Sequence, residues 1–193
     1  MIICVGGAHS RIGKTTLCSI LLKELKGFGA IKFTKTRLYT SIIDDPRILN
    51  EPGKDTAILL GSGAQMVLWI QSPPEALGVA LQTALSRMSH LEGIIVEGNS
   101  PVDFLNPHLV IFIVDAGGEI KPSALSVSKR ADIIVINSKE RVSNTLPFSP
   151  LTRGDRGCVF WSRGEIFWID LQNKRGEIDK FLSYVKKRIK ELH

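Results

Sequence analysis

The amino-acid sequence predicts an α/β fold: a mainly parallel sheet covered by helices on both faces. The apolar runs at residues 93–96, 109–114 and 133–136 are continuous rather than alternating, which is typical of strands buried on both sides. Segments whose apolar residues recur at helical spacing alternate with such runs over most of the chain. The first strand, at residues 2–5, leads through two glycines into a helix. Together these observations favour a parallel sheet over an all-helical or all-β fold.

The elements of the first third follow in order from these patterns. The β-branched run at residues 2–5 predicts a strand, and the spacing of Leu and Ile over residues 15–26 predicts a helix that ends at glycine. Residues 30–34 predict a second strand. From residue 35 to 54 the periodicity fails and prolines and acidic turns intervene, so we expect a long irregular segment. Loops of that length are usually functional.

The rest of the chain predicts further strands and helices and then a different C-terminal part. Two aromatic runs at residues 158–161 and 166–169 flank a polar turn, which predicts a β-hairpin, and an amphipathic helix follows it. We expect one nucleotide-binding domain over residues 1–193, with residues 158–193 as an appendage. The other expected elements are a short helix at 55–60, a strand at 66–70, a helix from Pro73 to about residue 88, the three strands named above and a short helix at 123–130.

Composition narrows the class of protein. The chain is 44% hydrophobic and 23% charged, which is ordinary for a globular domain and excludes a disordered or fibrous chain. No apolar run approaches the roughly 18 residues of a membrane span, and no leader precedes the first strand, so we expect a cytoplasmic protein without a membrane partner. Cys4, Cys18 and Cys158 show no metal-site spacing, and we expect them to be reduced thiols.

The strongest motif is A-H-S-R-I-G-K-T-T at residues 8–16, between a predicted strand and a predicted helix. It fits the phosphate-binding P-loop except that Ala8 replaces the first glycine, and we expect Gly6 and Gly7 to form the tight turn instead. Main-chain N–H groups would surround a phosphate, Lys14 would contact the β and γ oxygens, and Thr15 would ligate Mg²⁺. The expected nucleotide contacts in the loop are His9, Ser10, Arg11, Ile12, Gly13, Lys14, Thr15 and Thr16.

Two strand ends carry carboxylates that are candidates to support the metal. Glu97 ends the strand at 93–96 and precedes Gly98, and we expect it to hold Mg²⁺ together with Thr15, unless it merely caps a neighbouring loop. Asp115 ends the next strand and is the rival, although it also fits a turn before the glycines that follow it. The sequence leaves the choice between them open.

A third strand end is a candidate for contacts with the nucleotide base. Asn137 and Lys139 follow the strand at 133–136, where many P-loop proteins have an N-K-x-D element. Asn137 would present its amide to the base and Lys139 its aliphatic stem to the ring, and a plain turn at the strand end is the alternative. Arg11, within the loop, is a candidate phosphate clamp, a partner contact or an exposed side chain.

Beyond the loop, further blocks over about residues 1–140 carry a family resemblance. G-A-I-K-F-T at residues 29–34 is similar to a G-x-I-K-H-T pattern, P-G-K-D-T at 52–56 to P-G-K-D-S, and V-E-G at 96–98 to a V-E-G block. In this order the blocks resemble the B protein of molybdopterin-guanine dinucleotide biosynthesis. The histidines expected after the I-K strand are missing, and Phe33, Lys35 and Thr36 lie there instead. The C-terminal hairpin has no counterpart that we associate with that family.

The resemblance implies a GTP-binding accessory factor that binds GTP with Mg²⁺, hydrolyses it slowly and acts with a cofactor-biosynthesis partner, often as a homodimer. Lys14, Asp45 and Glu97 would then carry the catalysis. Asp44 and Asp55 are further candidates to orient water or complete the metal shell, and each of these aspartates also fits a helix cap or a turn.

Two other classes compete with this interpretation. The chain is similar, more distantly, to dethiobiotin synthetase and other small ATP-dependent ligases and kinases, whose glycines after a strand-end Asp resemble residues 115–118. A nucleic-acid-binding module is the third class, because +4 of the formal net charge of +6 falls on residues 151–193. That excess is small and the aromatic residues of the hairpin suit a sheet edge or a subunit interface better, so we expect no nucleic-acid partner.

Overall fold

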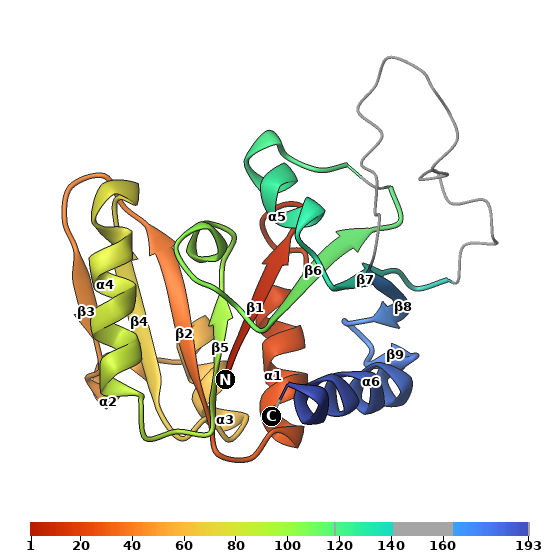
Figure 1. The fold of residues 1–193 in the computed structure, drawn as a ribbon, viewed down its shortest axis with the longest axis horizontal. Coiled ribbons are helices and arrows are strands. Elements are labelled where there is room, and N and C mark those ends of the chain that lie inside the picture. Colours follow the sequence, from red (N-terminus) through yellow and green to blue (C-terminus); the bar gives the residue numbers. More distant parts are fainter. Residues whose placement is uncertain (118, 141–163, 193) are drawn as a thin grey trace. The chain divides into compact units, whose positions relative to one another are not determined.

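The computed structural model describes residues 1–117, 119–140 and 164–192, and the chain divides into two compact units (Figure 1). The first unit comprises Met1–Val5 and Lys14–His108, and the second comprises Gly6–Gly13 and Leu109–His193. The chain passes from the second unit back into the first between Gly13 and Lys14, inside the predicted P-loop. Each unit contains its own strands and helices.

In the first unit the strand order is β3-β4-β2-β5-β1. Strands β1, β2, β4 and β5 are parallel, and the short β3 is antiparallel to β4 at the edge. The bounds are Ile2–Gly7 for β1, Phe28–Lys35 for β2, Ser41–Ile43 for β3, Val67–Ser72 for β4 and Gly93–Glu97 for β5.

Helices cover both faces of these strands. Gly29 on β2 faces α4, because a Cβ built on it would lie 2.3 Å from the Met88 side chain that follows this helix. Lys32 points to the opposite face, since successive side chains alternate along a strand, and there it meets Asp55 at the start of α3. The helices are α1 Lys14–Glu24, α2 Pro46–Leu49, α3 Asp55–Gly61, α4 Pro74–Arg87 and the short 3-10 helix η1 Ser100–Asp103.

In the second unit the strand order is β6-β7-β8-β9. Strands β6, β7 and β8 are parallel, and the two-residue β9 is antiparallel to β8. Helix α6 packs on β8, where Phe181 meets the ring of Phe167 edge to face. The bounds are β6 Leu109–Asp115, η2 Pro122–Ala124, α5 Leu125–Lys129, β7 Ile133–Asn137, β8 Glu165–Asp170, β9 Arg175–Gly176 and α6 Ile178–Glu191.

The apolar runs that predicted buried strands do form them. Ile3 on β1, Ile31 on β2 and Ile113 on β6 are fully buried, as is Leu77 on α4. Full burial of such a side chain contributes roughly 1.5–3 kcal/mol. The predicted α/β class with mainly parallel strands is confirmed. In the part of the chain that the structure describes, no helix has both the length and the apolar character needed to cross a bilayer.

Two regions differ from the sequence-based prediction. The segment at residues 35–54 is not wholly irregular, because it contains the edge strand β3 and the short helix α2. The second arm of the predicted C-terminal hairpin is strand β8, which pairs with β7 and continues the parallel strands of its unit. The first arm, at residues 158–161, lies outside the described residues.

Candidate functional site

Within the second unit, the first half of the predicted P-loop is anchored at Ala8. Its N–H donates to the carbonyl oxygen of Ile113 at 2.8 Å, and its own carbonyl accepts from the N–H of Lys121 at 3.1 Å. Ala8 is fully buried and does not have a positive φ, so the missing first glycine is tolerated. The expectation that Gly6 and Gly7 form the tight turn is wrong, because both continue strand β1.

The turn itself lies at Arg11 and Gly13, which have φ values of +62° and +103°. A side chain at position 13 would be strained by that φ, and its Cβ would lie 2.7 Å from the Leu171 side chain. Ser10 and Arg11 are exposed, whereas Ile12 is buried. The loop therefore presents the residues around its tip to solvent and requires glycine at its end.

Asn137 holds this loop in place. Its amide nitrogen donates to the carbonyl oxygen of Ile12 at 3.0 Å, and its amide oxygen accepts from the N–H of Leu171 at 3.0 Å. We expected this side chain to contact a base, and the structure instead engages both ends of the amide with main-chain groups. The exposed Lys139 lies two residues further along. In this geometry Asn137 positions the loop.

His9 and Asp115 form an ion pair at the loop. The Nε2 atom of His9 lies 2.7 Å from Oδ2 of Asp115, and Nδ1 lies 2.8 Å from the carbonyl oxygen of Ser10. Both ring nitrogens thus face oxygen acceptors, and only the doubly protonated ring donates to both. The hydrogen bond to Asp115 raises the pKa of His9, and the bond to the Ser10 carbonyl adds to this effect.

In the first unit, the second half of the motif starts helix α1 and meets the end of β5. Thr15 donates from Oγ1 to both carboxylate oxygens of Glu97, each at 3.0 Å. Glu97 is 2% exposed, so its carboxylate is buried with both oxygens facing the Thr15 hydroxyl. The following Gly98 has a φ of +144°, and a Cβ on it would lie 3.2 Å from Pro101 and 3.3 Å from Phe33. The close approach expected at this glycine is present.

Lys32 completes the cluster by bridging two carboxylates. Its Nζ atom lies 2.5 Å from Oε1 of Glu97 and 2.6 Å from Oδ2 of Asp55. Burial acts to lower the pKa of Lys32, but the charge of Glu97 and the hydrogen bonds to both carboxylates outweigh it, and the pKa is raised. Lys14 differs, because burial lowers its pKa more than Glu97 raises it. We call Thr15, Lys32, Asp55 and Glu97 the Glu97 cluster.

The Glu97 cluster has the oxygen donors that suit Mg²⁺. This ion prefers oxygen ligands and is usually held by one or two carboxylates together with substrate phosphates and water. A hydroxyl and a buried carboxylate in direct contact, on Thr15 and Glu97, match that preference. The Lys32 ammonium group balances the charge of the Glu97 carboxylate at this buried position.

The three aspartates near the long loop have different surroundings. Asp45 caps α2 by accepting from the N–H of Arg47 at 2.9 Å and forms an exposed ion pair with that side chain. Asp44 lies 3.3 Å from the Arg87 guanidinium. Only Asp55 joins the Glu97 cluster, and it is the first residue of α3 rather than its cap, which is Lys54.

Lys32 was not among the site residues expected from the sequence, although it lies in the G-A-I-K-F-T block. The available signal was a lysine within a strand whose neighbours Ala30 and Ile31 are apolar and buried. A charged residue in such a place is almost never buried without a partner. A lysine at this position therefore predicts a carboxylate nearby, but sequence spacing does not identify which one.

No protein-family profile matches the chain, and no curated protein matches it in sequence. Among solved structures, HypB from Helicobacter pylori in complex with nickel is similar with a TM-score of 0.56 and 13% identity, covering 98% of this chain and 87% of that one. LpxK from Aquifex aeolicus in complex with ATP has a TM-score of 0.49 and 16% identity, covering 86% of this chain and 53% of that one. The comparison at 0.56 bears on the fold alone: with the loop between β1 and α1, this chain has the α/β fold of the P-loop NTPases.

Proposed function

We propose that this protein binds a nucleoside triphosphate with Mg²⁺ at residues 9–16 and hydrolyses it slowly, as a GTP-binding accessory factor in molybdenum cofactor biosynthesis. One observation carries the proposal. Lys32, Asp55 and Glu97 come from three separate sequence blocks that resemble that family; Lys32 contacts both carboxylates, and Glu97 accepts a hydrogen bond from Thr15 of the P-loop motif. Charged side chains are rarely buried without partners, so the contact of Lys32 and Glu97 with each other and with these neighbours supports a common role.

The proposed roles follow from the contacts and charges. Lys14 contacts the β and γ oxygens of the nucleotide, and the burial of its ammonium group lowers its pKa more than the charge of Glu97 raises it. Thr15 and Glu97 support Mg²⁺, which neutralises phosphate charge when bound. Main-chain N–H groups of residues 10–16 cradle the phosphates. Because phosphoryl transfer depends on positioning and electrostatics, these groups account for slow intrinsic turnover.

In this proposal Asp55, rather than Asp45, is the carboxylate that orients the attacking water. Asp44, Asp45 and Asp55 were the candidates from sequence, with Asp45 preferred, but the Asp45 carboxylate caps α2 and pairs with Arg47. Asp55 is 47% exposed and contacts Lys32 in the Glu97 cluster. We therefore assign the orientation of the attacking water to Asp55 ahead of Asp45.

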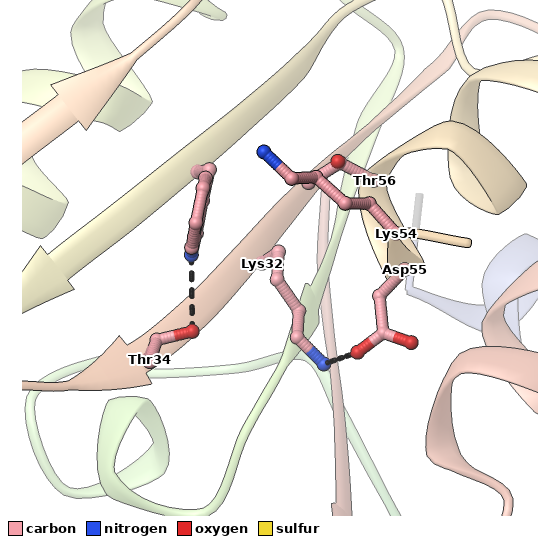
Figure 2. A pocket seen from close by; sticks show the side chains of 6 residues that line it. Lys32, Thr34, Lys54, Asp55 and Thr56 are labelled. Atoms are coloured by element: carbon pink, nitrogen blue, oxygen red, sulfur yellow. Dashed lines mark hydrogen bonds and ion pairs between the residues drawn. The ribbon is translucent and has the colours of Figure 1, made fainter. Parts of the chain in front are cut away.

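A small-molecule kinase or ATP-dependent ligase is the second candidate function. It is favoured by a pocket of about 190 Å³ beside the Glu97 cluster, which Lys32 and Asp55 help to line (Figure 2). A protein that only hydrolyses nucleotide needs no such pocket. The two functions differ in whether turnover depends on a small acceptor or on a protein partner.

Guanine preference distinguishes the two candidates. The amide of Asn137 is engaged by main-chain groups, so the preference for GTP rests on the family resemblance and on Lys139 with its neighbour Glu140. A site that hydrogen-bonds the exocyclic groups of guanine rejects adenine strongly, because a buried polar group would otherwise stay unpaired. Competition of ATP against a fluorescent GTP analogue tests this. Equal or better displacement by ATP moves the proposal to the kinase or ligase.

A further inference from the structure

The pocket beside the Glu97 cluster is lined on one side by the paired strands β2 and β4 and on the other by the start of α3 (Figure 2). Lys32 and Thr34 project into it from β2, and Trp69 from β4 is the register partner of Lys32. Lys54 and Asp55 face it from the helix start, with Thr56 behind them. A cavity of about 150 Å³ holds benzene, so a pocket of about 190 Å³ has room for one ring with small substituents.

Two polar groups in this pocket have unused hydrogen-bonding capacity. The Thr34 hydroxyl accepts the indole N–H of Trp69 at 3.0 Å, which leaves its own proton to donate. Asp55 uses Oδ2 for Lys32, and no contact of Oδ1 is present among the described residues. The pocket thus offers one donor and one acceptor. A ligand that matches them carries both an acceptor and an N–H or O–H donor.

A cation and an aromatic face complete the lining. The ammonium group of Lys54 lies over the Trp69 ring, 5.2 Å from its centroid, and both side chains line the pocket. The same ammonium contacts Glu51 at 2.8 Å and the carbonyl oxygen of Ile48 at 3.2 Å. Glu51 is 53% exposed, and ion pairs at such positions contribute little stability, so Lys54 can exchange Glu51 for another carboxylate.

We propose that this pocket is a binding site for a small aromatic carboxylate that bears a hydroxyl or amino group. The ring lies on Trp69, the carboxylate pairs with Lys54, and the hydroxyl or amine donates to Oδ1 of Asp55. Lys54 already contacts a carboxylate, that of Glu51, and the ring of Trp69. The ligand carboxylate would replace Glu51, and the ligand ring would share the Trp69 face with Lys54. This site shares Asp55 and Lys32 with the Glu97 cluster, but binding of the ligand does not require nucleotide, because every lining residue belongs to the first unit and none is part of residues 9–16.

The test is a titration of the protein with 4-hydroxybenzoate, without nucleotide, followed by ligand-observed NMR. We expect saturable binding that weakens at least about tenfold in Lys54→Met and in Trp69→Leu, which remove the charge and the aromatic face. Lys26→Met and Trp168→Leu are the matched controls, since Lys26 is exposed and neither residue lines the pocket; they should bind the probe as the unchanged protein does.

Two further probes separate the contributions of charge and ring. Benzamide keeps the ring without the charge, and cyclohexanecarboxylate keeps the charge without the aromatic face, so both should bind several-fold more weakly. Equal binding of the three probes, or equal binding by the pocket variants and their controls, would overturn the proposal. Displacement of 4-hydroxybenzoate by guanosine would also overturn it, because the pocket would then belong to the nucleotide base.

Discussion

The hydroxyl of Thr15, at the start of helix α1, donates to both carboxylate oxygens of Glu97, at the end of strand β5. The two residues are 82 positions apart in the chain, and the parallel pairing of β1 with β5 brings the two strand ends together. Gly98 adds to this arrangement, since its N–H donates to the carbonyl oxygen of Val5 at 3.0 Å. The contact ties the proposed metal-binding hydroxyl to a buried negative charge.

The first prediction concerns which carboxylate supports the metal. Glu97→Gln keeps the shape of the side chain and removes its charge, so nucleotide binding should require several-fold more Mg²⁺. Asp115→Asn is the matched control, because Asp115 also ends a strand but pairs with His9. Nucleotide titrations at stepped Mg²⁺ concentrations measure the effect. If only Asp115→Asn shifts the requirement, the metal has been placed at the wrong strand end.

The second prediction concerns the stability of the Glu97 cluster. Lys32→Met leaves the buried Glu97 without its ammonium partner, and breaking a buried pair in this way costs about 3 kcal/mol or more. Glu97→Gln should cost less, because Lys32 keeps its contact with Asp55. Urea unfolding of both variants and of the exposed control Lys26→Met gives the comparison. A Lys32→Met protein as stable as Lys26→Met would show that the cluster does not hold this part of the fold.

The third prediction is a pH dependence at the loop. Because the pKa of His9 is raised in the folded protein, the His9–Asp115 pair adds stability that is fully present below the unfolded histidine pKa of about 6.5. That contribution is lost as the pH rises through the higher folded pKa. The difference in unfolding free energy between the protein and His9→Gln should therefore be larger at about pH 6 than at about pH 9. An equal difference in unfolding free energy at both pH values would mean that the ion pair does not stabilise the folded protein.

The fourth prediction is a homodimer, which the family resemblance implies. The aromatic residues of the predicted hairpin also suit a subunit interface, but residues 158–161 lie outside the described residues. The dimer is therefore tested in solution. Light scattering at micromolar concentration should give twice the 21.3 kDa mass of the chain. A mass of 21.3 kDa would count against a dimer.

Much of the fold follows from local patterns in the sequence. Continuous apolar runs identify strands such as β5, β6 and β7, because burial on both faces leaves no polar positions. The edge strand β3 was missed, since three residues beside prolines and acidic turns carry no periodicity. The short helix α2 was missed for the same reason, although Asp45 before Pro46 is a recognisable start signal.

Site residues that belong to a short sequence motif could be predicted, whereas contacts between residues far apart in the sequence could not. Lys14 and Thr15 follow from the motif, and Glu97 follows from its position at a strand end. Lys32 lies 65 positions from Glu97, and sequence spacing says nothing about which carboxylates it bridges. Asn137 was a candidate for base contacts because a strand-end amide suits that role, with a plain turn as the alternative; its amide contacts with Ile12 and Leu171, distant in the sequence, could not be predicted from spacing.

The central claim is that residues 9–16 bind a nucleoside triphosphate with Mg²⁺, and a GTP titration with and without Mg²⁺ tests it most directly. We predict Mg²⁺-dependent binding that weakens at least about a hundredfold in Lys14→Ala, because a buried positive charge on the phosphates is lost. Thr15→Ala should chiefly remove the dependence on Mg²⁺. Thermal unfolding of each variant without ligand shows that it is folded. Unchanged nucleotide affinity in a folded Lys14→Ala protein would contradict the account.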